Sequence, residues 1–311
     1  MTTSVAMCTF NGARFIERQI ESILHQSLPI DEIVICDDGS TDGTIEIIEK
    51  YKEKFPNRFY LYKNIKSLGV RANFSKAIDL CTNDCIFLAD QDDIWIKEKT
   101  SEVVNYFIQN PNKSVIISNA NMIDEGDTMI SNLTLFDVLG LTEQLKYFDR
   151  GFAMEIFLRR NRATGCTMAL RKSFKAYIHI PEAIPNVYTQ IHDGSIAMAA
   201  IMRESLGYIE KPLTLYRQHA LQQIGLKDLL DKPWHFATPL LPLNYIDTSY
   251  GVSHPRINMQ LYRTEYIHGG SVLLHINQYY KAYGFKLMWI FICYDMYKKI
   301  CCHVKSILNF V

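Results

Sequence analysis

The sequence predicts an α/β fold in which a mostly parallel central sheet is covered by helices on both faces. Apolar runs of strand length alternate with runs whose apolar residues recur at helical spacing throughout the first half of the chain. The 311 residues are 48% hydrophobic and 21% charged, which is enough to bury one large core. Polar clusters rich in Asp follow several of the apolar runs, and ligands of parallel sheets bind at the edge where the strands end.

The first half of the chain contains the regular part of the pattern. Strands are predicted at Ser4–Thr9, Glu32–Cys36, Phe59–Tyr62, Cys85–Ala89 and Val115–Ile117. Helices are predicted around Phe15–Leu24, around Ile45–Phe55 and over Ala72–Cys81. Because strand and helix alternate, the crossovers between parallel strands should be right-handed.

The second half is less regular. Residues 126–160 are interpreted as loop and helix, Thr164–Leu170 as a turn followed by a strand, and Leu213–Leu215 as a further strand. A helix is predicted from Asp193 to about Glu204. Four prolines between 226 and 256 indicate an irregular segment, and the remainder from Ile257 is predicted to be helical. The expected division is a catalytic domain at 1–225 and an extension at 226–311.

Composition excludes some functions. Lys and Arg total 33 against 33 Asp and Glu, so the basic excess of a general nucleic-acid binder is missing. The eight cysteines form no Cys-x-x-Cys pair, and no signal peptide precedes the first strand, so reduced thiols in a cytoplasmic protein are expected. No apolar run reaches the ~18 residues of a membrane span.

Three polar clusters are expected to meet at one edge of the sheet. They are Thr9-Phe10-Asn11, Asp37-Asp38 and Asp90-Gln91-Asp92-Asp93, each at the end of a predicted strand. The acidic side chains of the third cluster repel one another unless a cation lies among them, and carboxylates together with substrate phosphates are typical Mg²⁺ ligands. The alternative is a solvated turn in which Asp93 caps a helix that starts at Ile94.

Four further features of the sequence bear on its function. Asp38–Glu49 fits the spacing of an EF-hand loop, but a strand rather than a helix is predicted before it. No glycine motif for dinucleotides or for a P-loop is present, so a diphosphate would be held in another way. His192-Asp193 begins the apolar helix, where the carboxylate is either a functional group or a cap. His219, two residues after Arg217, is either structural or part of a metal–diphosphate site.

In this order, the motifs resemble glycosyltransferase family 2, the inverting sugar-nucleotide transferases of the GT-A fold. The resemblance covers about residues 3–225, and the Asp-Gln-Asp-Asp-x-Trp form resembles the branch rich in rhamnosyltransferases and other O-antigen or capsule enzymes. The matching stretches are Thr9–Gly12, Gln19–Gln26, Asp37–Thr44, Gly69–Phe74, Asp90–Trp95, Thr164–Cys166, His192-Asp193 and Tyr216–His219.

The resemblance implies a role for each matching residue. Asp193 corresponds to the catalytic base, while Asp92 and His219 would bind Mg²⁺ or Mn²⁺ at the donor diphosphate. The implied substrate-binding residues are Thr9, Asn11, Asp38, Arg71, Asn73, Asp90, Gly165 and Arg217, with Thr9 and Asp38 on the base and ribose side. Two departures from the family pattern occur: Gly194-Ser195 follow the base where aromatic residues are common, and no Asn follows His219.

The implied activity is transfer of a sugar from a UDP- or dTDP-sugar to a glycan hydroxyl in bacterial surface polysaccharide synthesis. The acceptor is expected to be linked to a lipid such as polyprenyl diphosphate. The alternatives are a nucleotidyl- or phosphoryl-transfer enzyme and a non-catalytic sugar-nucleotide-binding module.

Beyond the resemblance, the C-terminal segment has an aromatic and apolar face together with five lysines between 281 and 305. This pattern favours a helix at the inner face of the cytoplasmic membrane. The alternative is packing against its own domain or against the second subunit of a homodimer.

Overall fold

A computed structural model describes residues 1–142, 157, 161–178, 192–220 and 222. The chain divides into two units, Met1–Leu240 and Leu241–Val311, and every described residue belongs to the first. The predicted boundary at 225/226 stays a prediction. The predicted C-terminal helix and its membrane face lie outside the described residues. Among the described helices, none has the length and apolar character needed to cross a membrane.

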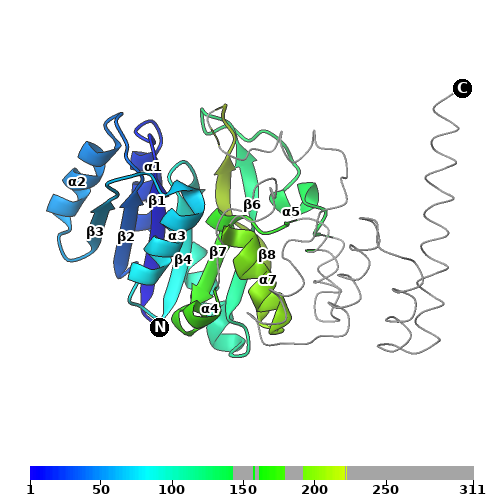
Figure 1. Ribbon diagram of the computed structural model, residues 1–311. Helices are drawn as coiled ribbons and strands as arrows, with labels where there is room; N and C mark the ends of the chain where they lie inside the picture. The colour runs from blue at the N-terminus through cyan, green and yellow to red at the C-terminus, as the bar shows by residue number, and fades with distance from the viewer. Residues whose placement is uncertain (143–156, 158–160, 179–191, 221, 223–311) are drawn as a thin grey trace, which may run out of the picture. The chain divides into compact units, whose positions relative to one another are not determined.

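One sheet organises the described residues (Figure 1). Its strands are β1 (Thr3–Thr9), β2 (Glu32–Asp37), β3 (Phe59–Lys63), β4 (Cys85–Asp90), β5 (Ile94–Trp95), β6 (Val115–Ile123), β7 (Met168–Arg171) and β8 (Leu206–Arg217). The helices are α1 (Ile16–Leu24), α2 (Thr44–Lys54), α3 (Gly69–Leu80), α4 (Lys99–Gln109), the short α5 (Leu135–Val138) and α7 (His192–Met202). The 3₁₀ turns are η2 (Gly165–Thr167) and η3 (Lys172–Tyr177).

The strand order is β3-β2-β1-β4-β7-β6-β8-β5. Strands β3, β2, β1 and β4 are parallel, and so are β6 and β8, whereas β7 runs antiparallel to both of its neighbours and β5 antiparallel to β8. The predicted α/β class with a mostly parallel sheet is therefore confirmed. The antiparallel direction of β7 and β5 is the part of the topology that the alternation of strands and helices did not predict.

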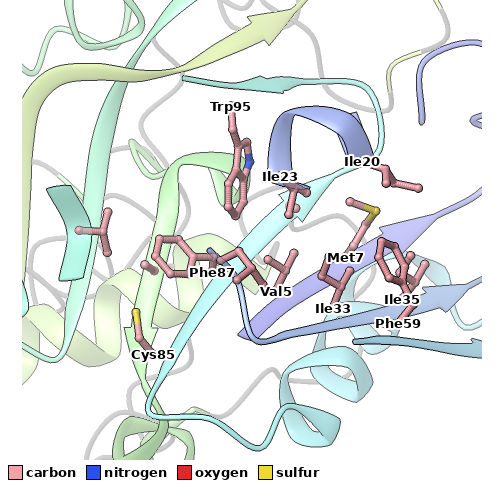
Figure 2. Packing of buried hydrophobic residues seen from close by; sticks show 14 of the residues in the cluster. Val5, Met7, Ile20, Ile23, Ile33, Ile35, Phe59, Cys85, Phe87 and Trp95 are labelled. Atoms are coloured by element: carbon pink, nitrogen blue, oxygen red, sulfur yellow. The ribbon is translucent and has the colours of Figure 1, made fainter. Parts of the chain in front are cut away.

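Helices cover both faces of the sheet. Alternate residues of β1 and β2, such as Val5, Met7, Ile33 and Ile35, pack with apolar residues of α1, α2 and α4 in one core cluster (Figure 2). Figure 1 shows α3 and α7 over the opposite face, where α3 contacts β1 and β2. Strands buried on both faces explain why β1, β2 and β4 are nearly continuous apolar runs.

The structure contradicts one alternative and one predicted boundary. No helix starts at Ile94: Ile94–Trp95 is a short strand paired with β8, and α4 starts five residues later at Lys99. Strand β6 extends to Ile123, well beyond the predicted Ile117, because it pairs along its whole length with β8. The helix predicted from Asp193 is confirmed as α7, which ends at Met202.

Candidate functional site

The strand-end clusters meet at one edge of the sheet, as predicted. Strand β1 lies between β2 and β4, and its last residues are in register with the last residues of both: Thr9 with Asp37, and Cys8 with Asp90. All three strands are parallel, so the loops that follow them leave the sheet on the same side.

The loops after β1 and β2 are fastened to each other by hydrogen bonds. The buried Thr9 hydroxyl donates to Asp37 Oδ2 (2.8 Å), and Asp37 Oδ1 accepts the backbone N–H groups of Gly39 (3.1 Å) and Ser40 (2.9 Å). Asn11 accepts the Thr41 N–H at 2.9 Å. A strand and not a helix precedes this loop, and Asp42 Oδ1 accepts the N–H of Thr44 in the loop itself, so the EF-hand alternative is excluded, as the sequence predicts.

Asp38 anchors the segment that leads into α3. Its two oxygens accept four hydrogen bonds, from the side chains of Asn64 (2.8 Å) and Ser67 (2.7 Å) and from the N–H groups of Leu68 (2.7 Å) and Gly69 (2.9 Å). Burial alone would raise the pKa of this carboxyl, but the hydrogen bonds outweigh it and lower the pKa below its ordinary value. We refer to Asp38 with residues 64–69 as the Asp38 cage.

Asn73 and Arg71 lie on the first turns of α3, beside this cage. The buried Asn73 amide donates to the Cys36 carbonyl (2.8 Å) and accepts from Asn64 (2.8 Å), so it ties α3 to β2. Arg71 is half-buried. Substrate binding by Thr9, Asn11, Asp38, Arg71 and Asn73 stays a prediction; the contacts described here give Thr9, Asp38 and Asn73 a part in shaping the loops.

The acidic loop after β4 meets the end of β8. His219 Nε2 and Asp92 Oδ2 lie 2.8 Å apart, and both side chains are mostly buried. Gln91 points the other way and makes two hydrogen bonds with the backbone of Phe10, which joins this loop to the one after β1. The two residues predicted to bind a metal, Asp92 and His219, are therefore brought together from positions far apart in the sequence.

Arg217 supports the acidic loop through hydrogen bonds to Asp92 and Asp93. Its side chain is fully buried, its Nε donates to the Asp92 carbonyl (2.6 Å), and its backbone N–H donates to Asp93 Oδ1 (2.9 Å). A third bond runs to the Asp124 carbonyl (2.8 Å), and an ion pair to Asp127 (2.6 Å). Substrate binding by Arg217 stays a prediction, but its contacts assign it the positioning of Asp92.

Phe15 completes the support of this region. Its ring lies 4.9 Å from that of His219, and the Arg217 guanidinium lies over it at 4.8 Å. Sequence reasoning had treated Phe15 only as a helical core residue. Its place at the start of α1, just after the first strand-end cluster, is the one signal that could have linked it to the site.

Asp90 and Asp93 lie in surroundings that disfavour their charged forms. Burial, followed by the charges of Asp93, Asp92 and Asp193, raises the pKa of Asp90 well above its ordinary range. Burial and then the charge of Asp92 raise the pKa of Asp93 to about 7. The side chains of Asp90, Asp93 and Cys166 lie within 4.8 Å of one another, and Gly165, which precedes Cys166, donates to Asp193, so the acidic loop and the start of α7 meet at this turn.

Asp193 is buried at the beginning of α7. Its Oδ1 accepts from Asn161 Nδ2 (2.8 Å) and from the Gly194 N–H (2.6 Å), and its Oδ2 accepts the Gly165 N–H at 3.1 Å. Burial raises its pKa to about 6 despite these bonds. A carboxylate with such a pKa is ionised at neutral pH and still basic enough to take a proton. Sequence reasoning missed Asn161, which lies in a run of arginines that looks like an ordinary charged surface.

Gly165 contacts two parts of this arrangement. It donates to Asp193, and a Cβ at this position would lie 2.7 Å from His192 Nε2, which leaves no room for a side chain. His192 is itself buried and stacks on Phe74 of α3 at a ring distance of 3.9 Å, so it does not yield easily. The predicted substrate-binding role of Gly165 stays a prediction.

The residues present fit a divalent cation at Asp92 and His219. One offers a carboxylate oxygen and the other an imidazole nitrogen, a combination that Mn²⁺ accepts and that Mg²⁺, which prefers oxygen, accepts less readily. Asp90, Asp93 and Cys166 also lie close together within the described residues. Burial raises the pKa of the Cys166 thiol well above its usual range.

Comparison with known proteins places these features in a family. The family model "Glycosyl transferase family 2" matches residues 4–178. The dTDP-rhamnosyl transferase RfbG of Shigella flexneri is 30% identical over 229 residues, which are 70% of this chain and 73% of that protein. The putative glycosyltransferase EpsE of Bacillus subtilis is 30% identical over 122 residues, 39% of this chain and 44% of EpsE.

Solved structures share the fold. TarS of S. aureus (residues 1–349) in complex with UDP has a TM-score of 0.52 at 18% identity, covering 70% of this chain and 60% of TarS. The same protein in complex with UDP-GlcNAc has a TM-score of 0.53 at 16% identity, covering 89% of this chain and 66% of TarS. At these identities the likeness concerns the fold.

Proposed function

The chain belongs to glycosyl transferase family 2 and has a GT-A fold, and from that premise we propose that it moves a sugar from a nucleoside-diphosphate sugar to a glycan hydroxyl with inversion. The observation that carries the proposal is geometric: the buried Asp193 is bound by the turn at Gly165, and the next residue, Cys166, lies beside Asp90 and Asp93 of the acidic loop, in which Asp92 contacts His219. Asp193 would act on the acceptor hydroxyl, and Asp92 and His219 would act on the leaving diphosphate.

The donor is proposed to be a UDP- or dTDP-sugar. The support is that the fold neighbour TarS was solved with UDP and with UDP-GlcNAc, and that the relative RfbG is named as a dTDP-rhamnosyl transferase. Thr9, Asn11 and the Asp38 cage would face the nucleoside, and Asp90 would approach the ribose or the sugar. Arg71 and Asn73, at the start of α3, would close this side.

The chemistry follows from the charge of Asp193. In its ionised form it accepts the proton of the acceptor hydroxyl while the hydroxyl oxygen bonds to the anomeric carbon. The bond from that carbon to the diphosphate oxygen breaks on the opposite face, and its electron pair leaves with the diphosphate. The Gly165 and Asn161 donors keep the Asp193 oxygens oriented during this transfer. A positioned base of this kind typically contributes ~10²–10⁴-fold to the rate.

Asp92 and His219 would hold Mg²⁺ or Mn²⁺. When bound, such a cation neutralises charge that builds up on a leaving diphosphate, which is worth several kcal/mol. Arg217 keeps Asp92 in place through the backbone of the acidic loop, and Phe15 keeps His219 in place from the side of α1.

The acceptor is proposed to be a lipid-linked glycan in bacterial surface polysaccharide synthesis, with the enzyme peripheral to the cytoplasmic membrane. The support comes from the names of relatives, which include a chondroitin synthase of Escherichia coli and a putative teichuronic acid biosynthesis glycosyltransferase of Bacillus subtilis. Contact with the membrane or with a second subunit would involve the segment beyond residue 225.

A thermal-shift screen tests the donor and the cation together. UDP, dTDP, UDP-GlcNAc and dTDP-rhamnose are added to the protein with and without Mn²⁺. A ligand at about 100 times its dissociation constant should stabilise the fold by roughly 2.7 kcal/mol. We expect one nucleotide to do so only with Mn²⁺, and the shift to disappear in Asp92→Ala. An equal shift in Asp92→Ala would remove Asp92 from the cation site, and no shift with any nucleotide would contradict the proposed donor class.

A further inference from the structure

Lys99 is a charged residue in the core next to the candidate site. It is the first residue of α4, and its side chain is fully buried. Its ammonium group donates to the Cys166 carbonyl (2.6 Å) and to the Thr214 hydroxyl (2.8 Å), and it lies 4.3 Å from the centre of the Trp95 ring. Within the described residues, no carboxylate lies within ion-pair distance of it.

Burial of this ammonium is costly, so its partners indicate what it does. Removing a lysine from water without an ion pair is energetically unfavourable. Burial accordingly lowers the pKa of Lys99, to about 8, while the negative charges of Asp93 and Asp90 oppose that shift. At neutral pH the group is still charged and can donate to both partners. A charged donor to a backbone carbonyl makes a stronger hydrogen bond than a neutral donor does.

The carbonyl that Lys99 binds belongs to the turn that binds Asp193. Cys166 follows Gly165 directly in η2, and the Gly165 N–H donates to Asp193 Oδ2. The buried His192 ring lies so close to Gly165 that a Cβ there would be 2.7 Å from His192 Nε2, so this turn has no room for a side chain at that position. Lys99 therefore binds the carbonyl of Cys166, while the N–H of the preceding residue, Gly165, binds and orients the Asp193 carboxylate.

We propose that Lys99 is a positioning residue for Asp193, acting through the Cys166 carbonyl and the Gly165 N–H. The inference rests on the proposed role of Asp193 as the base. It also joins three elements that contribute to the site from distant parts of the chain: α4 through Lys99, η2 through Cys166, and β8 through Thr214.

The test is Lys99→Met, which keeps the length of the side chain and removes the ammonium. The readouts are Mn²⁺-dependent hydrolysis of UDP-GlcNAc and dTDP-rhamnose, with water as the acceptor, and calorimetric binding of UDP and dTDP with Mn²⁺. We expect turnover of the accepted donor to fall at least tenfold, while its KM and the nucleotide dissociation constant stay within about threefold. The matched control is Lys175→Met, because Lys175 also donates to two backbone carbonyls, those of Asp79 and Cys81, at the opposite edge of the sheet. That variant should keep wild-type turnover.

Two further variants separate the possible outcomes. In an Asp193→Asn background, Lys99→Met should cost less than threefold in addition, since residues that act as one unit are not additive. A full tenfold additional loss, or a loss of nucleotide binding with turnover intact, would overturn the inference. If Lys99→Met does not fold, Gly165→Ala displaces the same turn from the His192 side and should give the same turnover-selective defect; wild-type turnover there would equally overturn it. Wild-type turnover in Asp193→Asn would instead contradict the proposed function.

Discussion

Two aspartates at the same edge of the sheet show how surroundings decide what a carboxylate does. Asp38 and Asp193 are both buried, and burial alone would raise the pKa of each. Four donors on the two oxygens of Asp38 overcome that effect and lower its pKa, whereas the three donors on Asp193 leave its pKa raised to about 6. The first residue is fixed in one charge state and shapes a loop; the second can exchange a proton near neutral pH.

Replacing the exchangeable carboxylate should have the largest effect. Asp193→Asn keeps the shape of the side chain and removes the base, so turnover should fall by about 10²–10⁴-fold while nucleotide binding with Mn²⁺ is kept. Donor consumption and calorimetry measure the two quantities. Asp79→Asn, an exposed change on α3, is the control. Wild-type turnover in Asp193→Asn would contradict the proposed difference between the two aspartates, because Asp193 would then have a structural role like that of Asp38.

The equivalent change at Asp38 should act on stability. In Asp38→Asn one oxygen becomes an NH₂ group that faces two donors and accepts from neither. The free energy of unfolding should fall by roughly 1.5–3 kcal/mol, the usual contribution of a hydrogen bond to a charged group. Urea denaturation measures it, again against Asp79→Asn. Unchanged stability would show that the cage contributes less than its four hydrogen bonds suggest.

The pH dependence sharpens the same contrast with a smaller effect. Asp193 must be ionised to act as a base, and its pKa is raised to about 6, so turnover should fall about tenfold per pH unit below that value and level off above it. The lowered pKa of Asp38 has the opposite sign: its stabilisation is complete above its ordinary pKa and is lost only as the pH falls through the lowered value. Unfolding measured between pH 5 and 7 should therefore show no loss of stability from Asp38, and a turnover profile flat across this range would contradict the role of Asp193.

The sequence predicted the first half of the fold far better than the second, for a physical reason. Strands β1, β2 and β4 are buried on both faces, so each is an uninterrupted apolar run whose ends are visible in the sequence. Strand β8 contains Glu210, Lys211 and Pro212, and its pairing with β6 shifts register near Asn119, so neither strand shows a clean pattern. Only the short apolar stretches of these two strands were predicted.

The candidate site was predictable to a similar extent. The strand-end carboxylates could be found because parallel strands end at a common edge, and the structure brings Asp92 and His219 together as expected. The supporting roles could not be found, although Arg217 itself was among the predicted substrate-binding residues. Lys99 lies in a charged Lys-Glu-Lys run that is typical of a solvated helix start, and the burial of Arg217 depends on contacts with residues more than ninety positions away.

The contacts of Arg217 also bear on the order in which the site is completed during synthesis. A nascent chain that has emerged only as far as α7 already carries every aspartate of the acidic loop and the four neighbouring parallel strands β3, β2, β1 and β4. It has neither the guanidinium that fastens this loop nor the imidazole beside Asp92. A chain that ends at α7 would thus carry the acidic loop without the two side chains that contact Asp92, and this part of the candidate site can be complete only after β8 and His219 are added.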